Sequence, residues 1–94
     1  MSDWPAEVRE VETSNLTRIR DFLLNQLATR GDLGPMDDED SLFLSGRLDS
    51  MDAMEIILFL EGQFGVDFSG LDFSLELIDR PLDVLALADH QIPR

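Results

Sequence analysis

The chain has 94 residues, and its 20 acidic side chains outnumber its seven basic ones, all arginine, so that the formal net charge is −13. A chain this short permits one domain with one small core. Cysteine is absent, which excludes a disulfide framework, a thiol nucleophile and a zinc–thiolate site. Such an acidic surface repels nucleic acid and anionic membranes and attracts basic partners, although a need for solubility would also explain a negative charge.

The amino-terminal residues "MSDWPAEVRE" contain neither the basic flank nor the apolar run of a secretory signal. No apolar run elsewhere approaches the roughly 20 residues that a membrane-spanning helix needs. We therefore expect a cytoplasmic protein without a membrane span.

The first predicted helix begins near Ser14. Apolar residues then recur at near-helical spacing, at Leu16, Ile19, Leu23 and Leu27. Gly31 and the following Gly-Pro pair end this element. We expect residues 1–13 to form an extension that is either helical or mobile, residues 14–90 to form the domain, and residues 91–94 to form a tail.

A long connection, "GDLGPMDDEDSLFLSGRL", occupies residues 31–48. Connections of this length are uncommon in compact domains and are often functional. The acidic cluster at 37–40 lacks the alternating ligands, central glycine and final glutamate of a calcium-binding EF-hand loop, so we interpret it as a solvated acidic loop. Leu42, Phe43 and Leu44 are expected to hold the connection against the core.

A second helix is predicted from Ser50 to Phe64, ending at Gly65. The segment "LDFSLELID" indicates a short third helix, and "RPLDVLALADHQ" indicates a last one, with Asp79 as its candidate cap. The predicted fold is all-α: a small up-and-down four-helix bundle with a long loop between helices 1 and 2 and a short third helix.

Autonomous catalysis is not supported by the residues available. A serine nucleophile needs a base, and the only histidine, His90, is close to the carboxyl terminus, while lysine, cysteine and tyrosine are absent. Paired carboxylates can in principle exchange protons, but a bundle of this size has little room for a closed cleft. We interpret His90 as a solvated residue or a partner of a helix dipole.

Ser50 has two interpretations. Either Ser50 or Asp49 can cap the second helix, a common role that needs no function. However, one cap is sufficient, and if Asp49 is the cap, with Asp52 completing an acidic first turn, Ser50 occupies the first helical position with its hydroxyl facing outward. The positive end of the helix dipole favours a phosphate ester at that position.

The second helix also presents two different faces. Stepping 100° per residue places the predicted core face at Ala53, Ile57, Leu60 and Phe64, with Ile56 at its edge. A second arc mixes apolar and acidic side chains, at Met51, Met54, Glu55 and Leu58, with Glu61 on its margin. This mixture suits a face that meets partners, because methionine adapts to different surfaces, whereas a wide core stripe with a few solvated acids is the simpler alternative.

The stretch "LDSMDAMEIILFLEGQFGVDF" resembles the acyl carrier proteins and their aminoacyl-carrying relatives. These proteins have Asp-Ser-Leu at the start of the second helix and an acidic, apolar helix that ends in Glu-x-x-Phe-Gly-Ile/Val. The corresponding residues here are Asp49-Ser50-Met51 and the run from Glu61 to Val66. The resemblance extends from the first helix to the last and includes the preceding "LFLSGRLDSM".

The resemblance implies that a separate phosphopantetheinyl transferase attaches 4'-phosphopantetheine from coenzyme A to Ser50, and that cargo is held as a thioester on the thiol of this arm. It also implies a monomer that meets a loading ligase and downstream transferases or synthases through their basic docking patches. The residues expected to contact these partners are Met51, Met54, Glu55, Leu58 and Glu61.

Some features depart from the usual family pattern and leave the cargo open. Met51 replaces leucine, a change that conserves volume, and the Asp-Ser-Met variant after "GRL" is closer to D-alanyl and other aminoacyl carriers. The region of the third helix lacks the sequence motif that is usual in the family. A second possibility is a non-catalytic acidic interaction module that keeps the fold without the arm, and a small carboxylate-based enzyme is a remote third.

Overall fold

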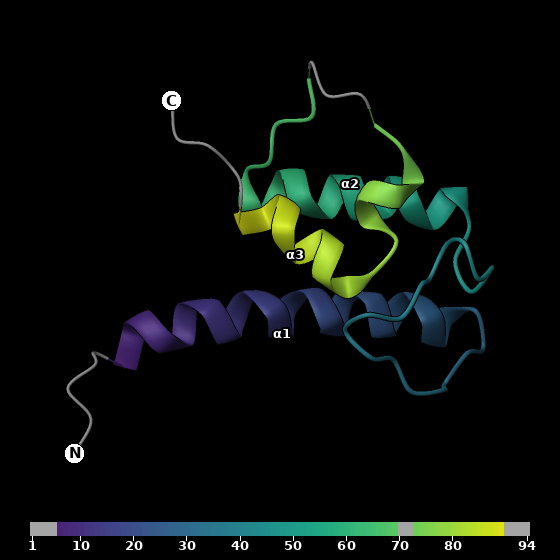
Figure 1. Ribbon diagram of the computed structural model, residues 1–94, viewed down its shortest axis with the longest axis horizontal. Helices are drawn as coiled ribbons and strands as arrows, with labels where there is room; N and C mark the ends of the chain where they lie inside the picture. Colours follow the sequence, from purple (N-terminus) through teal and green to yellow (C-terminus); the bar gives the residue numbers. More distant parts are fainter. Residues whose placement is uncertain (1–5, 70–72, 90–94) are drawn as a thin grey trace.

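The computed structural model describes residues 6–69 and 73–89, with side chains from residue 15 onward. Its elements are α1 (Ala6–Thr29), α2 (Ser50–Phe64), the 3-10 helix η1 (Leu75–Ile78) and α3 (Pro81–Asp89). Figure 1 shows α1 and α2 as the two long helices, with α3 packed between them. The predicted all-α class is confirmed for the described residues. The predicted count of four helices is not, because the expected third helix is a single 3-10 segment.

The first helix, α1, is longer than the sequence pattern predicted, since its backbone is helical from Ala6 rather than from about Ser14. Ile19, Leu23 and Leu27 lie on one side of it and are completely buried. The helix ends where Gly31 adopts a φ of +87°, a left-handed conformation that glycine adopts without a steric penalty. The amide of Asp32 then donates to the Leu27 carbonyl at 2.8 Å, which satisfies a carbonyl at the helix end.

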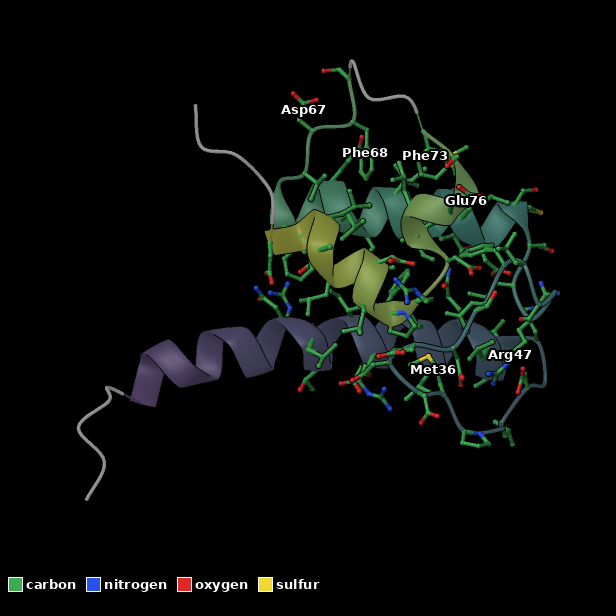
Figure 2. All side chains as sticks on the ribbon, in the orientation of Figure 1. Met36, Arg47, Asp67, Phe68, Phe73 and Glu76 are labelled. Atoms are coloured by element: carbon green, nitrogen blue, oxygen red, sulfur yellow. The ribbon has the colours of Figure 1, made fainter. Side chains whose placement is uncertain are left out.

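The predicted long loop between α1 and α2 is present, and a charged side chain joins its two ends. The Arg47 guanidinium contacts Asp32 at 2.8 Å and donates to the Pro35 carbonyl at 3.1 Å, so one side chain joins both ends of the loop. Figure 2 shows Arg47 and Met36 in this loop. The apolar side chains that the loop buries are Met36, Leu42, Phe43 and Leu48.

Two sequence predictions about this loop are wrong. Leu44 does not hold the loop against the core, because 70% of it is exposed. Asp79 is not the cap of the last helix. Its side chain turns back to the loop, where it accepts hydrogen bonds from the backbone amides of Phe43 at 2.8 Å and Leu44 at 2.9 Å. The start of α3 is instead closed by Asp83, which accepts from the Arg80 amide at 3.1 Å.

The buried face of α2 overlaps the predicted one but is rotated toward Ile56, which was predicted at its edge. Ala53, Ile56 and Leu60 are buried, whereas Ile57 and Phe64 are only half-buried. Phe64 instead contacts Phe59 edge to face, with ring centres 5.6 Å apart. Ile56 and Leu60 are fully buried, and each contributes about 1.5–3 kcal/mol by removal of apolar surface from water.

Candidate functional site

The start of α2 is fixed by a reciprocal pair of side chains on either side of Ser50. Asp49 is the N-cap, and its Oδ1 atom accepts hydrogen bonds from the amides of Met51 at 3.0 Å and Asp52 at 3.2 Å. The Asp52 carboxylate accepts in return from the Asp49 amide at 3.0 Å. These contacts form a capping box, in which two aspartates satisfy the amides that a helix start leaves unpaired.

Ser50 is therefore the first residue of the helix but not its cap. It is exposed, and its hydroxyl makes no hydrogen bond to the described part of the chain. The amino-terminal end of a helix carries partial positive charge, which favours a phosphate group at this position. An exposed hydroxyl with no structural role, located at the positive end of a helix, fits the attachment of a phosphate ester.

Arg30 connects this helix start to the end of α1, a contact that the sequence pattern did not reveal. Its Nη1 atom lies 3.0 Å from a carboxylate oxygen of Asp49 and 3.0 Å from one of Asp52. The hydrogen bond from Arg30, together with the Asp52 amide, lowers the pKa of Asp49 below its usual value. The same contacts, with the Asp49 hydrogen bond first, raise the pKa of Arg30.

Gln26 makes a second link between α1 and α2. This side chain is buried, and its Nε2 atom donates to the Asp52 carbonyl at 3.0 Å and to the Glu55 carboxylate at 3.2 Å. A glutamine on a helix face that is otherwise apolar was the only available signal for such a contact. With Arg30, it holds the first turn of α2 against the last turns of α1.

The predicted partner-facing arc is brought together on the exposed side of α2. Met51 is 76% exposed, Met54 is 59% exposed and Leu58 is 60% exposed. Glu55 and Glu61 are exposed beside them. We call these five residues, Met51, Met54, Glu55, Leu58 and Glu61, the α2 face. The alternative of a wide core stripe is wrong for the three apolar members, because each of them is mostly in solvent.

Other kinds of site are not found among the described residues. Within residues 6–69 and 73–89, no three histidine, cysteine, aspartate or glutamate side chains are arranged to hold a metal ion. No helix in that part of the chain has the length and apolar character to cross a membrane. The predictions for His90 and for the tail at 91–94 lie outside the described residues.

Comparison with known protein families gives a match that covers this site. The family model described as "Phosphopantetheine attachment site" matches residues 18–87, which is more than half of the chain. Neither the search of curated proteins nor the search of solved structures gave a significant match. The resemblance that the sequence motifs indicated is thus confirmed at the level of the family. The chain belongs to the phosphopantetheine attachment site family, whose members carry 4'-phosphopantetheine as a covalently attached cofactor.

Proposed function

We propose that this protein is a discrete acyl or aminoacyl carrier and that Ser50 is the residue that holds its 4'-phosphopantetheine. The arm would supply a terminal thiol on which cargo is held as a thioester, a group that this cysteine-free chain does not otherwise have. The observation that carries the proposal is the exposed Ser50 hydroxyl at the first position of α2, where Asp49 performs the capping.

The attachment step is a phosphoryl transfer from coenzyme A. The Ser50 Oγ atom would form a bond to the phosphorus next to the pantetheine, the bond from that phosphorus to the bridging diphosphate oxygen would break, and adenosine 3',5'-bisphosphate would leave. The described residues place no base against Ser50, so a separate phosphopantetheinyl transferase would accept the serine proton. This protein is therefore proposed to be a substrate of other enzymes and not an enzyme.

The residues around Ser50 would position it. The capping box fixes the backbone of the first turn, and Arg30 and Gln26 attach that turn to α1. Fixing the helix start holds the backbone of the serine in place and leaves its hydroxyl free to reach a second protein. Preorganisation of this kind lowers the entropy cost of reaching a reactive geometry.

The α2 face is proposed as the surface that meets partner enzymes. Its three exposed apolar side chains can be buried on contact, and Glu55 and Glu61 can pair with basic side chains of a transferase, a loading ligase or a downstream synthase. We propose that the carrier works as a cytoplasmic monomer that meets these enzymes in brief, salt-sensitive encounters. Its cargo class is acyl or aminoacyl, and the Asp-Ser-Met motif favours D-alanyl or another aminoacyl group.

Coexpression with a broad-specificity phosphopantetheinyl transferase tests the proposal. The intact mass is expected to rise by one phosphopantetheinyl group, and Ser50→Ala is expected to abolish the increase. Ser45→Ala provides the matched control, because Ser45 is also exposed and lies in the loop just before α2. An unmodified wild-type protein, with a transferase shown to be active on another carrier, would favour the interaction module without an arm.

A further inference from the structure

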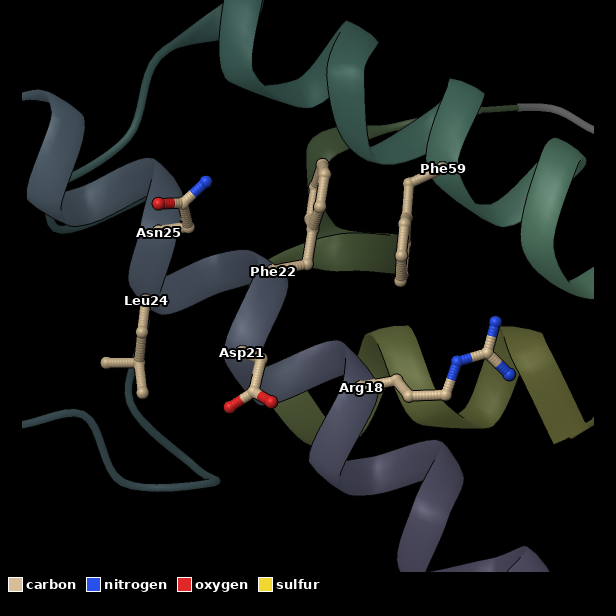
Figure 3. Close-up of a pocket in the computed structure, with 6 residues that line it drawn as sticks. All are labelled: Arg18, Asp21, Phe22, Leu24, Asn25 and Phe59. Carbon is tan, nitrogen blue, oxygen red and sulfur yellow. The ribbon is translucent and has the colours of Figure 1, made fainter.

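A stacked pair of phenylalanines lies between α1 and α2. The rings of Phe22 and Phe59 have centres 4.2 Å apart and an angle of 12° between their planes. Figure 3 shows the two rings side by side, one from each helix. Both residues are only half-buried, so part of this aromatic surface remains in contact with solvent. An apolar surface of this kind on a very acidic protein calls for an explanation.

Two openings share these rings as a common wall. One has a volume of about 670 Å³. Its lining residues are Arg18, Asp21, Phe22, Leu24, Asn25 and Phe59. The other, of about 330 Å³, is lined by Phe22, Glu55, Leu58, Phe59 and Gln63. We call the two openings together the α1–α2 groove. Both openings are lined by side chains from α1 and α2.

Gly62 lies one helical turn after Leu58 and Phe59, next to the groove. A glycine inside a helix is unfavourable relative to alanine, because it loses more conformational freedom on folding. No described residue requires this glycine, since a Cβ atom added there would meet nothing within 4 Å. Because Gly62 has no side chain, another molecule can approach the backbone of α2 closely at this position.

Two of the three charged side chains that line the groove are acidic. Asp21 is exposed and forms no ion pair or hydrogen bond with another described side chain, and Glu55 is bound only by the neutral Gln26. Arg18 is the groove's basic residue, but its guanidinium donates to Gln63 at 2.6 Å and lies 4.6 Å from the centre of the Phe64 ring. A ligand in the groove therefore meets apolar rings, two carboxylates that no described cation pairs with, and a guanidinium that already contacts Gln63 and Phe64.

We propose that the α1–α2 groove binds an amphipathic helix of a partner protein. An aliphatic or aromatic side chain of that helix would contact Phe22 and Phe59, and lysine or arginine side chains flanking it would pair with Asp21 and Glu55. A groove between two helices is a common binding site for a third helix, and the exposed backbone at Gly62 allows the partner helix to approach closely. The net charge of −13 favours a basic partner over an acidic one.

This surface shares Glu55 and Leu58 with the α2 face but does not include Ser50. Ser50 and Phe59 are nine residues apart on α2, which at 100° and 1.5 Å per residue places them on opposite sides of the helix and roughly 13 Å apart along its axis. A helix that contacts Phe59 does not cover Ser50. Binding in the groove is therefore expected to be the same with and without a modifiable Ser50. The inference thus stands whether or not Ser50 is modified.

A designed peptide of about 15 residues, long enough to form a helix on binding, provides the probe. It carries leucine and phenylalanine on one face and arginine and lysine on the other, and a second peptide scrambles the same residues. Nuclear magnetic resonance titration with the patterned peptide is expected to shift the amide of Gly62 and the rings of Phe22 and Phe59, and to leave the amide of Ser50 unchanged. The scrambled peptide is expected to bind at least roughly tenfold more weakly.

Substitutions at Gly62 separate specific docking from general attraction to an acidic protein, because they do not alter charge. Gly62→Ala is expected to raise the melting temperature and weaken peptide binding, and Gly62→Leu is expected to weaken it at least roughly tenfold. Ala86→Leu adds similar bulk to an exposed position on α3 and is expected to have no effect on binding, as is Ser50→Ala.

Three outcomes would overturn the proposal. Equal binding of the patterned and scrambled peptides, or of wild-type protein and Gly62→Leu, would show charge attraction alone. Self-association in sedimentation experiments that Gly62→Leu abolishes would identify a second copy as the occupant. Shifts at Gly62 and Phe59 on removal of residues 1–5 or 90–94 from the free protein would identify the chain's own terminus as the occupant.

Discussion

The guanidinium of Arg30 lies 3.0 Å from the carboxylate of Asp49, so that the residue just after α1 holds the cap of α2. The same nitrogen contacts Asp52, the second member of the capping box. The contact joins two helix ends across the long loop at the position of Ser50. Charge and backbone capping are therefore combined in a single cluster beside the proposed attachment site.

This cluster predicts a pH dependence of stability. The pKa of Asp49 is lower in the folded protein than in the unfolded chain, chiefly because of the hydrogen bond from Arg30. The ionised Asp49 therefore contributes fully to the free energy of unfolding above the ordinary aspartate pKa of about 4. This contribution is lost as the pH falls through the lower pKa of the folded protein. Arg30→Ala is expected to be less stable than wild type at pH 7, and the difference is expected to shrink on acidification. Urea unfolding at a series of pH values measures this, and a pH-independent difference would contradict it.

Asp79 is predicted to anchor the loop that precedes Ser50. Burial alone would raise its pKa, but the hydrogen bonds from the loop, with that from the Leu44 amide first, together outweigh that effect, so the pKa lies below its usual value. Asp79→Ala removes the acceptor from both amides and is expected to lower the free energy of unfolding by about 1–3 kcal/mol. Glu76→Ala, at an exposed position, is the control and is expected to change it by less than about 0.5 kcal/mol. Equal effects of the two substitutions in urea unfolding would argue against the anchor.

Adjacent isoleucines on α2 provide a test of the observed core. Ile56 is fully buried, whereas Ile57 is half-buried. Ile56→Ala is expected to cost about 2–5 kcal/mol of unfolding free energy, because it removes apolar contacts and leaves a cavity. Ile57→Ala is expected to cost distinctly less. Chemical denaturation measures both, and the reverse order would return the core to the face that the helical wheel predicted.

The α2 face is predicted to contribute to encounters with the transferase. Glu61→Arg is expected to lower kcat/KM for modification of Ser50, with the loss reduced at high salt, because exposed charges mainly affect the association rate. Glu39→Arg makes the same charge change at an exposed position in the loop and serves as the control. An equal loss in both variants would indicate that net charge, and not the α2 face, governs the encounter.

Local patterns in the sequence were sufficient to predict the structural features that depend on neighbouring residues. The start of α2 at Ser50 and its end before Gly65, which has a φ of +69°, follow from capping and glycine rules that operate within a few residues. The exposed apolar residues of the α2 face follow from helical spacing in the same way. The motifs that indicated the family also lie in and next to this stretch, and the family match itself extends over residues 18–87.

Features that depend on distant residues could not be read in this way. Gln26 reaches the start of α2 from α1, Arg30 reaches it from the position just after α1, and Asp79 reaches back about 35 residues to the loop. A helical wheel gives the angles between side chains but not the directions from which neighbouring elements approach. The prediction therefore placed Ile57 within the core face and Ile56 only at its edge, whereas Ile56 is the more buried of the two. The Phe22–Phe59 stack also joins two residues that are distant in the sequence, so the sequence pattern did not predict it.

The most direct test of the carrier assignment is to locate the modification within the chain. After incubation with coenzyme A and a phosphopantetheinyl transferase, the protein is digested and its peptides are fragmented in a mass spectrometer. The phosphopantetheinyl mass is expected on Ser50 alone. An adduct on Ser45, Ser41 or another serine, or the absence of any adduct with an active transferase, would contradict the central claim.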